Sequence, residues 1–180
     1  MGKTGKVAPA AGKAIKKARP GPVRRIIVDV ATQTLRVMEG RRLAARFPVS
    51  TSRFGLGFQE GSYRTPTGRF VVREKIGDGA PPWTIFRARR STGRQAHAGG
   101  KEDQVLTRIL TLDGLDPANT NSLKRYIYIH GTNQEDLIGS PASHGCIRLR
   151  NTDMVALHDL IEPGTPVLIR PPRRAAEILS

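Results

Sequence analysis

The chain has 180 residues and a formal net charge of +15, from 30 lysines and arginines against 15 aspartates and glutamates. This length and an apolar fraction of 38% fit one globular domain, and no apolar run reaches the length of a transmembrane helix. The single cysteine excludes an intrachain disulfide, while 19 glycines and 13 prolines indicate many turns, as in β-rich folds.

Residues 1–24 are predicted to form a basic tail outside the folded domain. They combine lysine and arginine with alanine, glycine and proline and carry no acidic residue, so they cannot build a core. Their charge favours a solvated arm, or non-specific attraction to an anionic partner such as nucleic acid, a membrane surface or a wall polymer; no motif for specific nucleic-acid binding is present. The tail lacks the apolar segment of a secretory signal. The cytoplasm is therefore expected if Met1 is the true start, and the periplasm or cell envelope if the start is truncated.

Short strands with tight turns are predicted for most of the remaining chain. Apolar and β-branched residues alternate between turn signals, beginning with a β-meander and continuing after a Gly- and Ser-rich loop at 50–61. The strands are expected at 25–30, 35–38, 43–49, 68–74, 105–112, 126–130 and 165–169.

A long polar segment, 75–103, is predicted to be irregular. Long loops within compact domains are often binding loops or lids. Trp83, the only tryptophan, lies in this segment close to Phe86. It is expected either to cap the core or to form a wall of a substrate cleft.

One amphipathic helix is predicted at 151–161. Asn151 suits the N-cap and Asp153 suits the first turn. The apolar side of the helix should pack on the sheet, and Pro163 with Gly164 should end it. Its buried face is expected to contain Met154, Leu157, His158 and Ile161. The fold class is thus mostly β, a curved sandwich or open barrel over 25–170 with one main helix, followed by a C-terminal tail at 171–180.

The chemistry is expected between Tyr126 and Leu149. His130 ends a predicted strand, and Cys146 follows 16 positions later within Ser-His-Gly-Cys. If the two side chains meet, the imidazole can take the thiol proton and leave a thiolate–imidazole pair that activates the sulfur. Gly145 has no Cβ, so a carbonyl can approach closely, and the N–H groups of Gly145 and Cys146 can face an oxyanion. Arg148 should point to the same side as Cys146, where its fork can bind a carboxylate.

Simpler interpretations of these residues remain open. Cys146 can be a small buried apolar residue, and Arg148 can be a surface charge. His130, His144 and Cys146 can also be three zinc ligands, although no second cysteine and no HExxH motif support such a site. His97 and His158 have no catalytic context and are expected to be structural or exposed.

Two motifs resemble the signatures of the L,D-transpeptidase (YkuD) family. HGT…SHGCIRL, beginning at His130, is similar to its catalytic motif, and Thr65-Pro66-Thr67-Gly68-Arg69-Phe70 is similar to its TPTGxF motif. The resemblance covers roughly 25–170 and implies the same β-rich fold. It also implies roles for a set of residues. Cys146 matches the nucleophile, His130 the base, and His144, Gly145 and Arg148 the supporting and substrate-binding positions. Beside these, Ser143 and Gly131 are expected to support the site, and Thr132, Tyr128 and Trp83 are expected to contact the substrate. Some family members have serine where Gly131 stands, so a backbone carbonyl is expected to orient His130 here.

The resemblance further implies an enzyme that acts on peptidoglycan stem peptides or muropeptides without a cofactor. In this family the cysteine attacks the amide after the third stem residue, and D-alanine leaves. Water as acceptor gives L,D-carboxypeptidation, which is expected for a cytoplasmic enzyme of muropeptide recycling. The alternatives are an exported enzyme that makes 3–3 crosslinks or attaches proteins to peptidoglycan, and a non-catalytic module that binds wall or polyanion.

Overall fold

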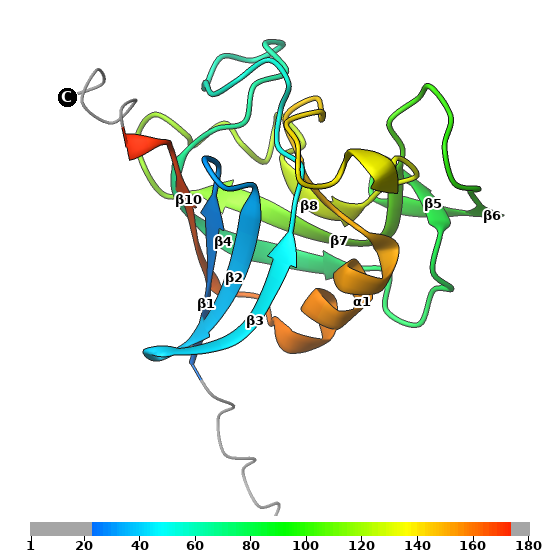
Figure 1. Cartoon of the computed structure of the whole chain (residues 1–180), viewed down its shortest axis with the longest axis horizontal. Helices are drawn as coiled ribbons and strands as arrows, with labels where there is room; N and C mark the ends of the chain where they lie inside the picture. Colours follow the sequence, from blue (N-terminus) through cyan, green and yellow to red (C-terminus); the bar gives the residue numbers. More distant parts are fainter. Residues whose placement is uncertain (1–22, 174–180) are drawn as a thin grey trace, which may run out of the picture.

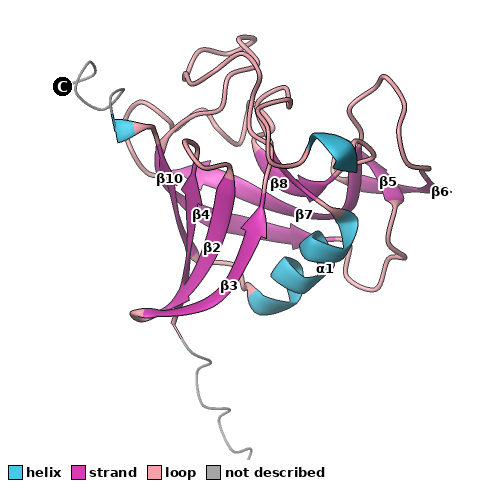
Figure 2. Cartoon of the chain, in the orientation of Figure 1, coloured by secondary structure: helices cyan, strands magenta, loops and turns pink. Residues whose placement is uncertain are grey.

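The computed structural model of the protein describes residues 23–173. A single ten-stranded mixed sheet curves through this region, and one α-helix packs on it (Figures 1 and 2), which confirms the mostly β prediction. The strands are β1 (Arg24–Asp29), β2 (Thr34–Glu39), β3 (Arg42–Pro48), β4 (Gly68–Ile76), β5 (Thr84–Arg87), β6 (Arg90–Gln95), β7 (Val105–Gly114), β8 (Tyr128–Gly131), β9 (Ile147–Leu149) and β10 (Pro166–Arg170). The helices are the α-helix α1 (Asn151–Leu160) and the 3₁₀ turn η1 (Glu135–Leu137).

The first three strands form the predicted antiparallel meander. Ile26 pairs with Val37, and Val28 pairs with Leu35, and all four side chains are fully buried. These four side chains place one face of the meander on the core, because successive side chains of a strand point to opposite faces.

Strand β10 lies between the meander and the rest of the sheet. It pairs in parallel with β1, where Val28 faces Ile169, and antiparallel with β4, where Phe70 faces Val167. The order of strands is therefore β3-β2-β1-β10-β4-β7-β5-β6, with β8 joined to β7 and β9 joined to β8.

The prediction for residues 75–103 was wrong in part, because this segment contains the hairpin β5–β6. All six residues of β6 are exposed, so its sequence has no apolar alternation that would indicate a strand. The turn uses Ala88 and Arg89 at φ 46° and 65°, whereas glycine and asparagine are the residues that usually signal such a turn. The strand expected from Tyr126 also begins later, at Tyr128, since Tyr126 has φ 57° and is exposed.

Helix α1 packs against β7 and β8 through the predicted face. Met154, Leu157 and Ile161 are completely buried, and His158 is nearly so. Arg150, not Asn151, is the N-cap residue, and its own side chain does not cap the helix; the N–H of Asn151 donates to Glu135 Oε1 at 2.7 Å. Asn151 is the first helical residue and is buried, where its amide donates to the carbonyl of Thr132 at 2.8 Å.

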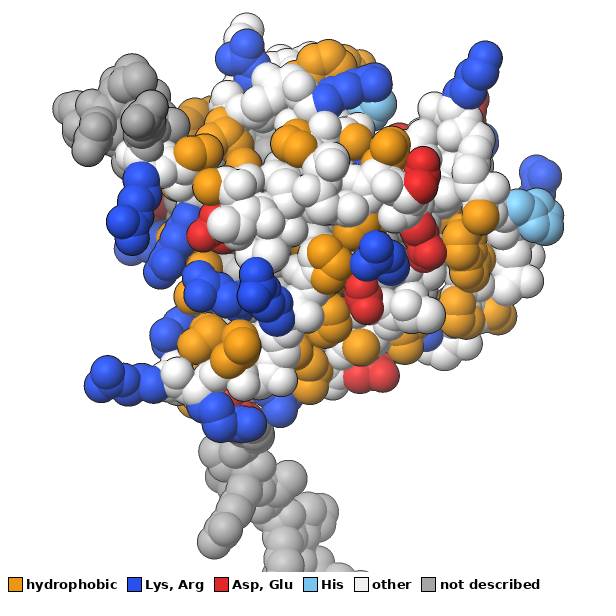
Figure 3. Space-filling view, in the orientation of Figure 1, with side chains coloured by type: hydrophobic (Ala, Val, Ile, Leu, Met, Phe, Trp, Pro, Cys, Tyr) orange, Lys and Arg blue, Asp and Glu red, His pale blue; other side chains and the backbone are white. Residues whose placement is uncertain are grey.

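Basic side chains gather over the meander side of the surface (Figure 3), where Arg25, Arg41, Arg42 and Arg46 are exposed. Most of the two predicted tails, 1–22 and 174–180, lies outside the described residues, so the anionic partner expected for the basic tail stays a prediction. Within 23–173, no helix is long and apolar enough to cross a membrane.

Candidate active site

The site is built on the pairing of β8 with β9. These strands are parallel, with His130 opposite Arg148, and Cys146 comes immediately before β9. His130 and Cys146 therefore belong to adjacent segments of the sheet and open into one cavity of about 570 Å³. The cavity is lined by Arg53, Lys101, Glu102, Asp103, Val105, His130, His144 and Cys146.

The Cys146 thiol is held by the backbone of the segment just before β8. Its Sγ donates a hydrogen bond to the carbonyl of Tyr126 at 3.2 Å, and its side chain packs against the cluster formed by Phe86, Ile109 and Tyr128. Burial raises the pKa of the thiol to about 12, a change that a hydrogen bond from the Tyr128 backbone only partly opposes. The resting sulfur is consequently protonated at neutral pH.

His130 is buried and oriented by a backbone carbonyl, as expected from the glycine that follows it. Its Nδ1 lies 2.7 Å from the carbonyl oxygen of Gly131, so Nδ1 carries the proton and Nε2 keeps its lone pair. Burial lowers the pKa of the imidazole, against an opposing effect from the carboxylate of Asp103. Burial thus favours the neutral form of both the imidazole and the thiol, and the expected thiolate–imidazole ion pair stays a prediction.

The loop before Cys146 is fixed by hydrogen bonds of its own. Ser143 Oγ donates to the Cys146 carbonyl at 2.7 Å and accepts the N–H of Gly145 at 3.2 Å. Thr65, from the TPTG motif, donates to the Gly145 carbonyl at 2.9 Å. Glycine suits this position mainly because its φ is +117°. The Gly145 N–H already has an acceptor, which does not match its expected role as an oxyanion donor, and the role of the Cys146 N–H stays a prediction.

Arg148 lies in the interior, away from the cavity. Its side chain is fully buried, and it contacts Asp103 Oδ1 at 2.9 Å, Gln134 Oε1 at 2.8 Å and Ser50 Oγ at 3.0 Å. The guanidinium is therefore already paired, which does not match the expected contact with a substrate carboxylate. Sequence periodicity gave the correct strand but cannot reveal partners that come from distant loops.

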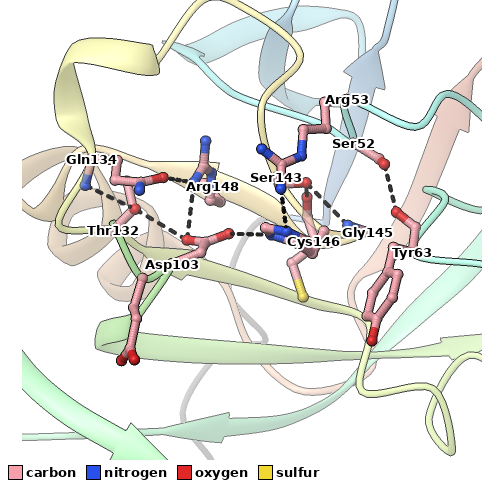
Figure 4. A network of polar contacts seen from close by, with 12 residues as sticks. Ser52, Arg53, Tyr63, Asp103, Thr132, Gln134, Ser143, Gly145, Cys146 and Arg148 are labelled. Atoms are coloured by element: carbon pink, nitrogen blue, oxygen red, sulfur yellow. Dashed lines mark hydrogen bonds and ion pairs between the residues drawn. The ribbon is translucent and has the colours of Figure 1, made fainter. Parts of the chain in front are cut away.

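Asp103 is the central residue that the sequence does not reveal. Figure 4 shows its carboxylate next to Arg148, and the other carboxylate oxygen faces the imidazole of His144. Oδ1 also accepts a hydrogen bond from Thr132 Oγ1 at 3.4 Å, and Oδ2 lies 3.6 Å from His144 Nδ1. Thr132 is buried, so it supports Asp103 and has no free hydroxyl for a substrate.

Comparison with known proteins decides the family. A model of the L,D-transpeptidase (YkuD) catalytic domain matches residues 23–169. The chain belongs to the L,D-transpeptidase family. Bacillus subtilis YkuD is 44% identical over 144 residues, which cover 80% of this chain and 64% of that protein. Escherichia coli YcfS is 29% identical over 151 residues, which cover 80% of this chain and 43% of that protein.

Solved L,D-transpeptidases share the fold. One from Mycobacterium tuberculosis has a TM-score of 0.56 at 18% identity, covering 84% of this chain and 59% of its own. The Enterococcus faecium C442S mutant has a TM-score of 0.52 at 19% identity, covering 82% of this chain and 49% of its own. The chain thus spans less than two thirds of the length of each of these four relatives.

Two other residues expected to contact substrate do not line the cavity of this L,D-transpeptidase domain. The hydroxyl of Tyr128 accepts a hydrogen bond from Arg89 Nε at 2.9 Å, and its ring is 5% exposed. Trp83 lines a separate surface pocket with the segment around His97. Neither lines the cavity that contains Cys146.

The glycine at position 131 has a structural explanation in this family member. Gly131 lies directly against Asn151 Oδ1, where an added Cβ would collide with the amide oxygen. A serine cannot fit there without displacing Asn151, so the carbonyl of Gly131 replaces a side chain as the partner of His130.

Within the described part of the chain, no three His, Cys, Asp or Glu side chains are arranged to hold a metal ion.

Proposed function

We propose that the protein catalyses cysteine-dependent acyl transfer on peptidoglycan stem tetrapeptides, with release of the terminal D-alanine. The observation that carries this proposal is the shared cavity of Cys146 and His130, with the proton of His130 held on Nδ1. Nε2 is then the ring nitrogen that can accept the thiol proton, which is the requirement for a general base. Membership of the family supports the substrate class.

The reaction begins from two neutral groups. Sγ attacks the carbonyl carbon of the amide between the third residue and D-alanine, while His130 Nε2 takes the thiol proton. In this proposal the Cys146 N–H donates to the resulting oxyanion. His130 then gives the proton to the amide nitrogen, and the C–N bond breaks. D-alanine departs, and the rest of the stem peptide stays on Cys146 as a thioester.

Water is the acceptor that this proposal favours, as in an L,D-carboxypeptidase. His130 would deprotonate the water, whose oxygen attacks the thioester and releases a tripeptide with a free carboxylate and the thiol. The cavity of about 570 Å³ is within the usual range for one bound ligand, and water requires no second peptide subsite. The cytoplasmic location expected from the sequence stays a prediction, which fractionation of native cells tests.

Incubation with a disaccharide tetrapeptide, followed by mass analysis, tests the proposal. The wild type should release D-alanine and tripeptide through an acyl-enzyme intermediate, and Cys146→Ala should release neither while keeping its circular dichroism spectrum and melting curve. Turnover by Cys146→Ala at the wild-type rate would exclude the cysteine mechanism. A folded wild type that binds the muropeptide without turnover would indicate the non-catalytic module instead. Crosslinked 3–3 dimers, with an amine as acceptor, would keep the chemistry and replace the carboxypeptidase by a transpeptidase.

A further inference from the structure

Arg53 provides an exposed guanidinium in the wall of the cavity that contains Cys146. It lies in the loop between β3 and β4 and lines the cavity together with Lys101. Within residues 23–173, no carboxylate forms an ion pair with Arg53. This differs from Arg148, whose guanidinium is buried and held by Asp103.

The backbone of Arg53 is attached directly to the loop before the nucleophile. The Arg53 N–H donates to the carbonyl of Ser143 at 3.2 Å, and Ser52 pairs with Ser143 as an isolated β-bridge. The Ser52 N–H donates to Thr65 Oγ1 at 3.0 Å, and the same hydroxyl holds the Gly145 carbonyl. The position of the Arg53 Cα is therefore fixed relative to Cys146 by groups that also shape the catalytic loop.

The side chain of Arg53 is oriented by its neighbours. Nη2 lies 2.7 Å from His144 Nε2, and the guanidinium carbon lies 5.0 Å from the centre of the Phe54 ring. The His144 ring in turn packs against Phe54 and Tyr63, each with a centroid separation of 5.7 Å. Only one of the five N–H donors of Arg53 is used by His144, so the others are available to a ligand in the cavity.

Charge in the cavity favours an anionic ligand at Arg53. The carboxylate of Asp103 is balanced by Arg148 at 2.9 Å, which leaves two cations in the wall, Arg53 and Lys101, against one carboxylate, Glu102, and so a surplus of one positive charge. A guanidinium binds a carboxylate through two parallel hydrogen bonds, and partial preorganisation reduces the entropy lost on binding.

We infer that Arg53, and not Arg148, binds a carboxylate of the substrate. This inference rests on the proposed function for the identity of the substrate, but its chemical basis is the unpaired guanidinium in the cavity. A stem peptide offers two sources of that carboxylate, the C-terminus of D-alanine and a carboxylated side chain at the third residue. Both use the same chemistry and are distinguished by the choice of substrate below.

Alkylation of Cys146 tests the binding of an anion without using peptidoglycan. Iodoacetate carries a carboxylate where iodoacetamide carries a neutral amide. The rate of alkylation by iodoacetate divided by the rate with iodoacetamide therefore reports the attraction of a carboxylate to the cavity. Arg53→Gln should lower this ratio by roughly fivefold, as expected for loss of about 1 kcal/mol of charge interaction. Arg73→Gln removes the same charge from an exposed position on β4 and should leave the ratio unchanged. Equal ratios for the wild type and both variants would overturn the inference.

Steady-state kinetics then identify the carboxylate. With a stem tetrapeptide, Arg53→Gln should lower kcat/KM by roughly 10- to 100-fold, the range for loss of a hydrogen bond to a charged group, mainly through a higher KM. Arg53→Lys should recover part of that loss. If the D-alanine carboxylate is bound, replacing it by a carboxamide should remove the difference between the wild type and Arg53→Gln. If the side chain at the third residue is bound, replacing it by one that ends in an amine should do so instead.

The two substrate series separate the possible failures. A variant effect of equal size on every substrate would mean that Arg53 only positions His144, and would overturn the inference while leaving the cysteine mechanism intact. Absence of turnover by the wild type would contradict the proposed function, and the alkylation ratio would still report on Arg53.

Discussion

Asp103 and Arg148 form an ion pair of 2.9 Å beneath the active-site cavity. The Arg148 side chain is fully buried, whereas that of Asp103 is 14% exposed. An arginine cannot escape such burial by losing its proton, since its pKa is too high. The carboxylate of Asp103 is therefore required as the counter-ion of the buried Arg148 guanidinium. Because the same carboxylate also faces His144, it links the stability of the domain to the position of that imidazole.

Replacing Asp103 by asparagine should strongly destabilise the fold. The change leaves a buried cation without its counter-ion, which typically costs about 3–5 kcal/mol. Urea denaturation followed by circular dichroism measures the loss. Glu60→Gln is the matched control, because the Lys124–Glu60 pair is 74% and 58% exposed and should contribute within about 1 kcal/mol. Equal losses in the two variants would contradict the requirement for a buried counter-ion.

Alkylation of the free enzyme by iodoacetamide should follow the raised pKa of Cys146. Only the thiolate reacts, so with a pKa of about 12 the rate should rise roughly tenfold for each pH unit above neutrality. It should not reach a plateau before the protein unfolds. A plateau near pH 7 would instead indicate that the resting site holds a thiolate–imidazole ion pair.

His130→Asn should slow formation of the acyl-enzyme by roughly 10²–10⁴, the range for loss of a general base. Because burial lowers the pKa of His130, the neutral base should persist below the ordinary value of 6.5 in the wild type. The acid limb of kcat/KM should accordingly lie below pH 6.5. Replacement of the exposed His97 by asparagine should change neither quantity, and an unchanged rate in His130→Asn would transfer the role of base to another group.

Stability should fall as the pH drops below 6.5. Burial lowers the pKa of both His130 and His158 in the folded state, so in this range the unfolded chain binds more protons. Each histidine should contribute a slope of up to about 1.4 kcal/mol per pH unit, present above the unfolded pKa and lost as the pH falls towards the folded pKa. Urea midpoints between pH 7.5 and pH 5 measure this slope. His158→Gln should reduce it by about half, and an unaltered slope would show that His158 is not the group responsible.

Local patterns predict the frame of the domain well. The meander, β4, β7, β10 and helix α1 all carry apolar side chains in the runs or periods typical of their secondary structure, and all were predicted close to their observed bounds. The hairpin β5–β6 was not predicted, because every residue of β6 is exposed and the turn lacks glycine. Hydrogen bonding of the backbone, rather than burial of alternate side chains, forms that strand.

The chemistry of the site was only partly predictable. Cys146 and His130 are found because they stand in a recognisable motif, and the structure brings both to one cavity. Asp103 lies in a polar loop where a carboxylate has no local pattern, and Arg53 lies in another loop with no motif around it. Their importance comes from tertiary contacts with Arg148 and His144, and such contacts leave no periodic signal in the sequence.

The place of β10 in the sheet has a consequence for biosynthesis. Because β10 lies between β1 and β4, these two strands gain a neighbour at their facing edges only after residue 170 has left the ribosome. Until then the facing edges of β1 and β4 have no neighbour, and unpaired strand edges are sites of association between chains. A nascent chain stopped before Pro166 would therefore expose two such edges, so the domain depends on its final strand for protection against aggregation during translation.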